Sequence, residues 1–434
     1  MGSQNLGNRN WKSWGSGLAV YARPRLLSVL LMGFASGLPL ALTGATLGIW
    51  LAEARISMTD IGFFALVGLS YNFKFLWAPL IDRLPVPLLT RRLGRRRSWA
   101  LVFQILLIAA LLLMGGSDPT IHPAFTAFCA VLVAFFSASQ DIVIDAFRVE
   151  LLDESEQGAG AAATQAGYRL GMIASGAGAL YAASAFGWMA AYAIMAGLMT
   201  IGIATILATP EPQANPDSIR PHGGFEEMIV APFREFMHRR GWLVILIFAI
   251  LYKLSDAVAG HMAGPFYVSL GFTKPEIASI SKVFGVVATI VGISLGGIVV
   301  YRFGTLRALL LGSLLQMLST AMYILQAHLG HDVPGLAFTI GLENLAGGIS
   351  SAAFVAYLSG LCSRAYTATQ YALLSALAAF GRSFFASYGG ILIDRLGWVR
   401  FFEISILLAL PGLLLLFWLM RQAGPEASTP VPAN

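Results

Sequence analysis

Long apolar runs separated by short polar connections form the dominant pattern of this 434-residue chain. A helix needs about 20 mostly apolar residues to cross the hydrocarbon core of a bilayer. Because backbone groups in lipid must be satisfied within each segment, and because the two-residue alternation of a membrane barrel is missing, the runs predict an all-α membrane protein. We expect about twelve membrane-spanning helices, near residues 27–49, 61–81, 98–116, 124–147, 159–182, 188–208, 242–262, 276–300, 306–326, 335–360, 367–391 and 398–420.

The composition agrees with this pattern. Hydrophobic residues make up 57% of the chain, charged residues only 12%, and the mean hydropathy is +0.73. Soluble domains carry about 25% charged residues, so most of this surface is expected to face lipid. The net charge of +6 comes from basic residues in short loops, which argues against nucleic-acid binding.

Lys and Arg residues lie mostly in alternate connections, such as the run RRLGRRR at 91–97. The opposite set of connections holds only Arg55, Lys274, Arg395 and Arg400. By the positive-inside rule, both termini are expected to be cytoplasmic. The N-terminal residues lack the pattern of a cleavable signal peptide, so we expect the first span to act as its own insertion signal.

One long polar connection divides the chain into two sets of six spans. The predicted parts are a cytoplasmic segment 1–26, a six-helix half 27–208, a cytoplasmic linker 209–241, a second half 242–420 and a cytoplasmic tail 421–434. The linker part from Phe225 to Arg240 mixes apolar and charged residues and is expected to lie as an amphipathic helix on the inner membrane face.

The two halves carry matching features. Gly187-Trp188 opens the sixth span and Gly397-Trp398 opens the twelfth, while Arg169 and Arg382 occupy similar places in the fifth and eleventh. A duplicated six-helix unit predicts the major facilitator fold, with two pseudo-symmetric halves and a central site.

The fourth span contains charged residues, in the segment SASQDIVIDAFRVELL at 137–152. Asp141, Asp145 and Arg148 share one helical face because they lie four and seven residues apart. A charge inside a membrane costs several kcal/mol and usually serves a task. Asp141 lies deeper, and we interpret it as a proton carrier or as part of a substrate site.

A structural interpretation applies to the residues nearer the cytoplasm. Asp145, Arg148 and Glu150 are expected to form a charge lock with Asp82 and Arg83, which holds an inner gate shut.

Cations outnumber acids deep in the spans. The cations are Lys74, Arg169, Lys253, Lys282 and Arg382, whereas the acids are Asp141, Asp256 and Glu343. This excess predicts a cavity for an anionic substrate, in which Arg169 and Arg382 grip a carboxylate or phosphate in bidentate fashion. Alternatively, each cation pairs with a neighbouring acid, and Lys253 shares a face with Asp256.

Glu343 and Asn344 lie in the outer third of the tenth span, within reach of Lys282 or Arg382. Structural pairing and proton coupling remain open for Glu343. No phosphate-binding loop, metal-ligand cluster or nucleophile–base set accompanies these residues, so we predict a gradient-driven transporter without cofactor or metal rather than an enzyme.

Several motifs taken together resemble the AmpG-type muropeptide permeases. They are MGFASGLPLALTGATLGIWL in the first span, FFALVGLSYNFKFLWAPLIDR in the second, LGRRRSW after it, SASQDIVIDAFRVELL in the fourth and GYRLGM in the fifth. The strongest similarity covers about residues 30–190. Some members of this family carry further C-terminal spans, whereas only residues 421–434 follow the twelfth predicted span here.

The resemblance implies a proton-coupled importer in the inner membrane of a Gram-negative bacterium. Its substrates would be anhydromuropeptides (GlcNAc-anhydroMurNAc peptides) that enter the cytoplasm for cell-wall recycling by alternating access. The motif positions carried over are Lys74, Asp82, Arg83, Gln140, Asp141, Asp145, Arg148, Tyr168 and Arg169.

Combining residues and resemblance gives the full expected site. Protons would bind Asp141, Glu343 and Asp256, and substrate would contact Tyr71, Lys74, Gln140, Tyr168, Arg169, Tyr252, Lys253, Asn344 and Arg382. The protein is expected to act as a monomer. Two alternatives remain: a transporter of another anion such as acetyl-CoA, and a non-transporting membrane assembly factor, against which the five buried cations argue.

Overall fold

The computed structural model describes residues 23–153, 157–212, 237, 241–361 and 379–422. Within these ranges the chain is helical and contains no strand, as the sequence predicted. The predicted amphipathic segment 225–240 lies almost entirely outside the described residues, as do the first twelve positions of the predicted span 367–391.

The N-terminal half begins at Pro24 and ends at Ala208. Its helices are α2 (Pro24–Thr43), α3 (Ala45–Glu53), α4 (Met58–Phe63), η2 (Phe64–Gly68), α5 (Leu69–Asn72), η3 (Lys74–Leu76), α6 (Ala78–Arg83), α7 (Thr90–Leu93), α8 (Arg95–Gly115), α9 (Pro123–Leu151), α10 (Gln157–Ile173), η5 (Ala174–Gly178) and α11 (Ala179–Ala208).

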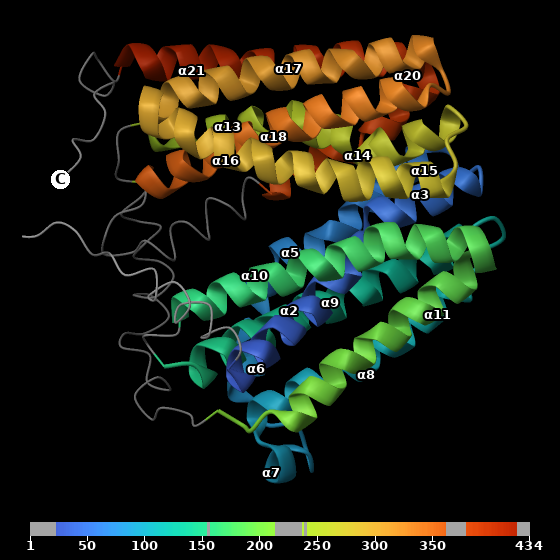
Figure 1. Cartoon of the computed structure of the whole chain (residues 1–434), viewed down its shortest axis with the longest axis vertical. Helices are drawn as coiled ribbons and strands as arrows, with labels where there is room; N and C mark the ends of the chain where they lie inside the picture. The colour runs from blue at the N-terminus through green and yellow to red at the C-terminus, as the bar shows by residue number, and fades with distance from the viewer. Residues whose placement is uncertain (1–22, 154–156, 213–236, 238–240, 362–378, 423–434) are drawn as a thin grey trace, which may run out of the picture.

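The C-terminal half lies above it in Figure 1. Its helices are α13 (Trp242–Tyr252), α14 (Leu254–Ser269), α15 (Lys274–Ile277), η8 (Ala278–Phe284), α16 (Gly285–Phe303), α17 (Thr305–Leu329), α18 (Val333–Leu361), α20 (Gly389–Leu407) and α21 (Leu410–Gln422).

Eight helical segments of the described chain are long and apolar enough to cross a membrane. Two of them, Ala163–Ala208 and Gly389–Gln422, are interrupted at Gly187 and Gly397. The second predicted span is divided into short helices from α4 to α6. The expected number of twelve spans is therefore confirmed only in part.

The two halves share backbone breaks at matching places. Gly187 has φ 81° and ψ 170°, and Gly397 has φ 77° and ψ 172°. Gly94 and Gly304, which precede α8 and α17, show the same conformation, with φ 89° and 79°. Only glycine adopts such angles without strain. These four glycines end one helix and start the next, in agreement with a duplicated unit.

Helices α2 and α10 cross at van der Waals distance through glycines. A Cβ atom added to Gly33 or Gly37 would collide with the backbone of Thr164 or Tyr168 on α10. Gly167 on α10 lies equally close to Leu30 of α2. Small residues of this kind allow close helix packing in membranes. The crossing fixes Tyr168 beside the middle of the first span.

The two halves meet at one end of the molecule and diverge toward the other (Figure 1). At the meeting end, which we call the closed end, α3 and α4 of the N-terminal half contact α14 and α20 of the C-terminal half, and α11 contacts α15. On the predicted orientation this end faces the periplasm.

Polar contacts reinforce the closed end. The Asp394 carboxylate accepts hydrogen bonds from the Thr59 amide, at 2.8 Å, and from the Thr59 hydroxyl, at 2.6 Å. Tyr181 and Ser279 lie 2.6 Å apart through their hydroxyls. Lys274 forms an ion pair with Glu53.

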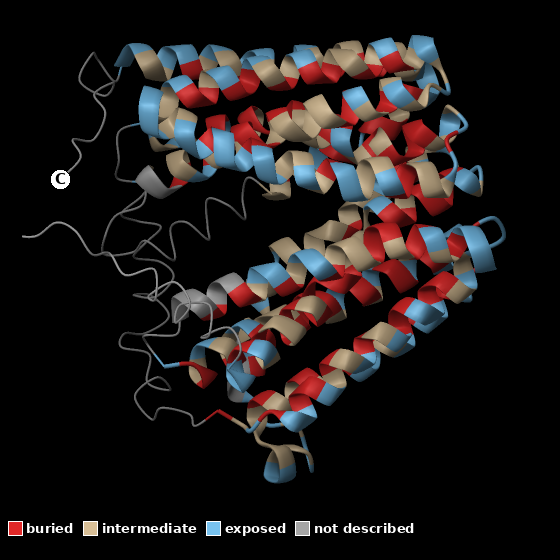
Figure 2. Cartoon of the chain, viewed as in Figure 1, coloured by how far each residue is buried: buried red, intermediate tan, exposed pale blue. Residues whose placement is uncertain are grey.

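Burial separates the interior of each half from its outer face. Figure 2 shows buried residues inside the halves and exposed ones on their outer helices. Large apolar side chains are among the exposed residues, including Phe186 at 72%, Leu414 at 68% and Phe338 at 63%. So many exposed apolar side chains suit a surface that faces lipid.

Candidate functional site

In the N-terminal half, Asp141 of α9 lies against the middle of α2. The Ser36 hydroxyl donates a hydrogen bond to the Asp141 carboxylate. One residue earlier, the buried Gln140 side chain donates to the Ala35 carbonyl oxygen at 3.0 Å. Lys74, at the start of η3, lies within electrostatic range of Asp141. The structure thus brings together the predicted residues Lys74, Gln140 and Asp141.

Polar atoms without protein partners surround this carboxylate. The Tyr71 hydroxyl, the Ser137 hydroxyl and the Gln140 Oε1 atom are buried and form no hydrogen bond with any residue that the structure describes. Leaving a buried polar group unsatisfied costs about 1–3 kcal/mol. Tyr168 of α10 also lies within electrostatic range of Asp141. This group of donors and acceptors is suited to a polar ligand.

Of the five residues predicted for the inner lock, Asp145, Arg148 and Glu150 have side chains that the structure describes. Glu150 forms a buried ion pair with Arg96 of α8, at 2.7 Å between Nη2 and Oε1. Asp145 is exposed, and the Arg148 Nε atom is buried without a hydrogen-bond partner among the described residues. The side chains of residues 82 and 83 lie outside the part that the structure describes.

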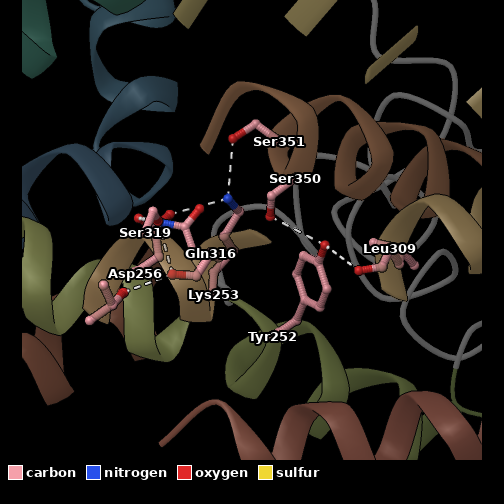
Figure 3. A network of polar contacts seen from close by, with 9 residues as sticks. Tyr252, Lys253, Asp256, Leu309, Gln316, Ser319, Ser350 and Ser351 are labelled. Atoms are coloured by element: carbon pink, nitrogen blue, oxygen red, sulfur yellow. Dashed lines mark hydrogen bonds and ion pairs between the residues drawn. The ribbon is translucent and has the colours of Figure 1, made fainter. Parts of the chain in front are cut away.

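In the C-terminal half, Lys253 lies at the break between α13 and α14 and forms the centre of a polar network (Figure 3). Its ammonium group lies 3.1 Å from the Asp256 carboxylate and 3.2 Å from the Ser351 hydroxyl. Gln316 of α17 donates to the other Asp256 oxygen at 3.1 Å. The i, i+3 pair expected from the sequence is therefore present, within a larger network.

Tyr252 faces away from this network (Figure 3). Its hydroxyl donates to the Leu309 carbonyl oxygen at 3.1 Å and accepts from Ser350 at 3.2 Å. The ring stacks on Phe354, with centroids 5.3 Å apart. Ring and hydroxyl of Tyr252 thus have partners in the C-terminal half.

Glu343 and Asn344 of α18 form a second polar group. Asn344 donates to the Glu343 carboxylate at 2.8 Å and accepts from the Thr289 hydroxyl at 2.8 Å. Lys282, Lys253 and Asp256 all lie within electrostatic range of Glu343. The predicted neighbourhood of Glu343 and Lys282 is therefore present in the structure.

Lys282 also touches the opposite half. Its aliphatic stem lies 3.6 Å from the position a Cβ atom would take on Gly176. Both residues belong to π-helical turns, η5 and η8. Such turns are rare and often occur at functional sites.

Arg169 and Arg382 lie at different seams between the halves. Arg169 lines a cavity of about 200 Å³ with residues of α16, namely Val286, Thr289, Ile290, Ile293 and Ser294. Arg382 lines a cavity of about 370 Å³ with Ala65, Asp256, Ala257, Gly260, His261, Ser383 and Ala386. The structure places the two arginines in separate cavities, and the bidentate grip expected for each of them stays a prediction.

Several uncharged hydrogen-bond partners of the site residues were not predicted from the sequence. Ser36, Thr289 and Gln316 contact the predicted charged residues, yet each lies in a span where single hydroxyl and amide side chains are common. Gln316 could have been singled out from the sequence, since a long amide side chain within an apolar run needs a polar partner.

The chain is similar in sequence to known membrane transporters. Residues 29–329 match the sequence profile described as the Major Facilitator Superfamily. The anhydromuropeptide permease of Escherichia coli (strain K12) is 43% identical over 401 residues, which cover 92% of this chain and 80% of that protein. The putative transporter AmpG 4 of Rickettsia conorii (strain ATCC VR-613 / Malish 7) is 35% identical over 399 residues, which cover 91% and 96%.

Solved structures with low sequence identity share the fold. A bacterial homolog of the human lysosomal transporter Spinster, inward-facing and unoccupied, matches with a TM-score of 0.72 at 13% identity, over 98% of this chain and 100% of that one. A D-xylose–proton symporter matches with a TM-score of 0.69 at 14% identity, over 94% and 99%.

Proposed function

Because the chain belongs to the Major Facilitator Superfamily and, within it, to the AmpG-type permeases, we propose that it imports anhydromuropeptides into the cytoplasm together with protons. The observation that carries the proposal is the 43% identity with the E. coli permease over 92% of the chain. The matched relatives and the structural neighbours above are transporters, which supports transport rather than catalysis.

The chemistry of the site supports this substrate class. Anhydromuropeptides combine amino-sugar rings, which carry hydroxyl and acetamido groups, with peptide carboxylates. In the N-terminal half, the unpartnered atoms of Tyr71, Ser137 and Gln140 offer hydrogen bonds to a sugar. Lys74, Arg169 and Arg382 supply positive charge for the carboxylates.

Alternating access provides the route. The closed end joins α3 and α4 to α14 and α20, and the halves diverge at the opposite end (Figure 1). Rocking of the two halves about the central polar groups would open the closed end and load substrate from the periplasm. The protein acts in this proposal as a monomer in the bacterial inner membrane, with both termini in the cytoplasm.

Three carboxylates are candidates for the proton. Asp141 lies beside the unpartnered polar atoms of the N-terminal half, whereas Asp256 is bonded to Lys253 and Gln316. Glu343 lies between the network and the seam at η8. A carboxyl group that binds and releases a proton changes from acceptor to donor, which alters the relative stability of two transporter states. We assign the main role to Asp141.

Uptake by the purified protein tests the proposal. In proteoliposomes, labelled anhydromuropeptide should accumulate when the outside is acidic and fall to the equilibrium level when a protonophore is added. If folded protein ignores muropeptide under both conditions but takes up labelled acetyl-CoA, the substrate assignment is wrong and the second transporter hypothesis replaces it.

A further inference from the structure

Thr289 connects the Arg169 cavity to the polar group around Glu343. Its hydroxyl lies 2.9 Å from the Gly285 carbonyl oxygen and 2.8 Å from the Asn344 Oδ1 atom. A hydroxyl has one hydrogen, so it shares this hydrogen between two acceptors. Since Thr289 also lines the cavity, an anion bound beside Arg169 would offer a third acceptor.

Asn344 continues the connection. Its Nδ2 group donates to Glu343 Oε2 at 2.8 Å and to the Ile340 carbonyl oxygen at 3.0 Å. The oxygen of the Asn344 amide thus bonds Thr289, which lines the cavity, and the nitrogen bonds the Glu343 carboxylate. The charged and titratable groups that face Glu343 are Lys282 from η8, Lys253 and Asp256 near the α13–α14 break, Tyr267 from α14 and Tyr323 from α17.

The Arg169 cavity has the features of an anion subsite. Arg169 forms no ion pair with any residue that the structure describes, and it enters the cavity from the half opposite to Thr289. The remaining wall is largely apolar, through Val286, Ile290 and Ile293. The Arg169 side chain is exposed in this cavity, so it can reach an incoming carboxylate and bind it through two parallel hydrogen bonds.

We propose that Thr289 and Asn344 transmit the binding of a substrate carboxylate at Arg169 to the protonation of Glu343. This inference rests on the proposed function, and it adds a coupling route with Thr289 as its positioning residue. The bound carboxylate accepts the hydrogen bond that the Thr289 hydroxyl otherwise donates to Asn344. Without this donor, the Asn344 amide is less firmly oriented, and its hydrogen bond to the Glu343 carboxylate weakens. Two nearby negative charges also repel, and a proton on Glu343 removes this repulsion.

The coupling is reciprocal. If substrate favours the protonated state of Glu343, the protonated state must favour substrate by the same factor. The proton on Glu343 adds to the one assigned to Asp141. Both come from the periplasmic solution and leave to the cytoplasm, so accumulation of substrate requires both carboxyl groups. Because Arg169 belongs to the N-terminal half and Glu343 to the C-terminal half, the route also crosses the seam at which the halves move.

The test compares Thr289→Val with wild type in the full-length protein. Valine keeps the shape and removes the hydroxyl. Exchange of labelled for unlabelled anhydromuropeptide across proteoliposomes, without a pH gradient, reports substrate binding and movement. Accumulation driven by an inward proton gradient reports coupling. Loss of the Thr289 hydrogen bond should weaken exchange by no more than about threefold, because Arg169 still holds the carboxylate, whereas accumulation should fall by about tenfold or more.

Two further variants serve as controls. Thr289→Ser keeps a hydroxyl and should restore accumulation. Thr200→Val removes a hydroxyl of α11 that donates to its own helix at Gly197 and lies outside both cavities, and it should behave as wild type. Size-exclusion profiles in detergent confirm that each variant is folded.

Each result has one meaning. Wild-type accumulation in Thr289→Val overturns the coupling route. Loss of both exchange and accumulation in folded Thr289→Val also overturns it, since Thr289 would then be required for substrate movement itself rather than for its coupling to the proton. Absence of exchange in the wild type overturns the proposed function itself, and the coupling route with it.

Discussion

The Ser36 hydroxyl donates a hydrogen bond to the Asp141 carboxylate and thereby joins α2 to α9. Ser36 is positioned by the glycine contacts that hold α2 against α10, on either side of it at Gly33 and Gly37. A carboxylate can only accept hydrogen bonds, whereas a carboxylic acid also donates one. Protonation of Asp141 would therefore change its hydrogen bond to Ser36 of α2. It would also give Asp141 a hydrogen to donate toward the Tyr71 hydroxyl, which lies within electrostatic range.

Replacing Asp141 tests its role in coupling. Asp141→Asn is expected to lose accumulation driven by a proton gradient, because the amide cannot take up and release a proton, while substrate exchange continues. Uptake and exchange in proteoliposomes measure the two activities. Asp118→Asn is the control, since this exposed carboxylate lies in the loop before α9, accepts hydrogen bonds from Thr120, and should leave accumulation unchanged. Full accumulation by Asp141→Asn would assign the proton to another residue.

The Lys253–Asp256 pair should contribute strongly to stability. The Lys253 side chain is only 5% exposed, so Asp256→Ala would leave its charge buried without its acid partner. Removing one partner of a buried pair costs about 3–5 kcal/mol. We expect a clear fall in the midpoint of thermal unfolding in detergent.

An exposed pair provides the comparison. Arg400 and Glu403 also lie at i, i+3, but their side chains are 70% and 40% exposed. Glu403→Ala should cost less than about 1 kcal/mol and barely move the midpoint. Equal effects of the two substitutions would show that the Lys253 network contributes no more than a surface contact.

A disulfide across the closed end tests whether transport requires this end to open. The Thr59 hydroxyl lies 2.6 Å from the Asp394 carboxylate across the two halves. A Thr59→Cys, Asp394→Cys variant should cross-link on oxidation, which should stop uptake, and a reductant should restore it. The two native cysteines, Cys129 and Cys362, would first be replaced by serine so that only the introduced pair can cross-link. Undiminished uptake by fully cross-linked protein would show that transport does not require this end to open.

The crossing of α2 and α10 predicts a steric effect at Gly37. A Cβ atom there meets the Tyr168 backbone, so Gly37→Ala should force the helices apart and lower the free energy of unfolding by about 1–3 kcal/mol. At Gly197 of α11 nothing lies within 4 Å of an added Cβ atom. Gly197→Ala should be neutral or stabilise by up to about 1 kcal/mol. The midpoints of thermal unfolding distinguish the two, and equal midpoints would contradict the observed crossing.

Hydrophobic patterning was sufficient to predict the all-helical architecture, although twelve spans are confirmed only in part, and local spacing predicted the Lys253–Asp256 pair. Both predictions depend on nearby residues. Contacts between distant helices were not predictable in this way. Glu150 pairs with Arg96 because α8 packs on α9, and no spacing rule connects these positions. Likewise, the placement of Arg169 and Arg382 at separate seams follows from how the halves dock.

The central claim is that this chain moves anhydromuropeptide and protons together. The most direct measurement records the internal pH of proteoliposomes that contain a trapped pH indicator and start without a gradient. Adding anhydromuropeptide outside should acidify the interior in the wild type, and Asp141→Asn should show no such change. Labelled substrate that enters without any change of internal pH would contradict proton coupling, and no entry at all would contradict the substrate assignment.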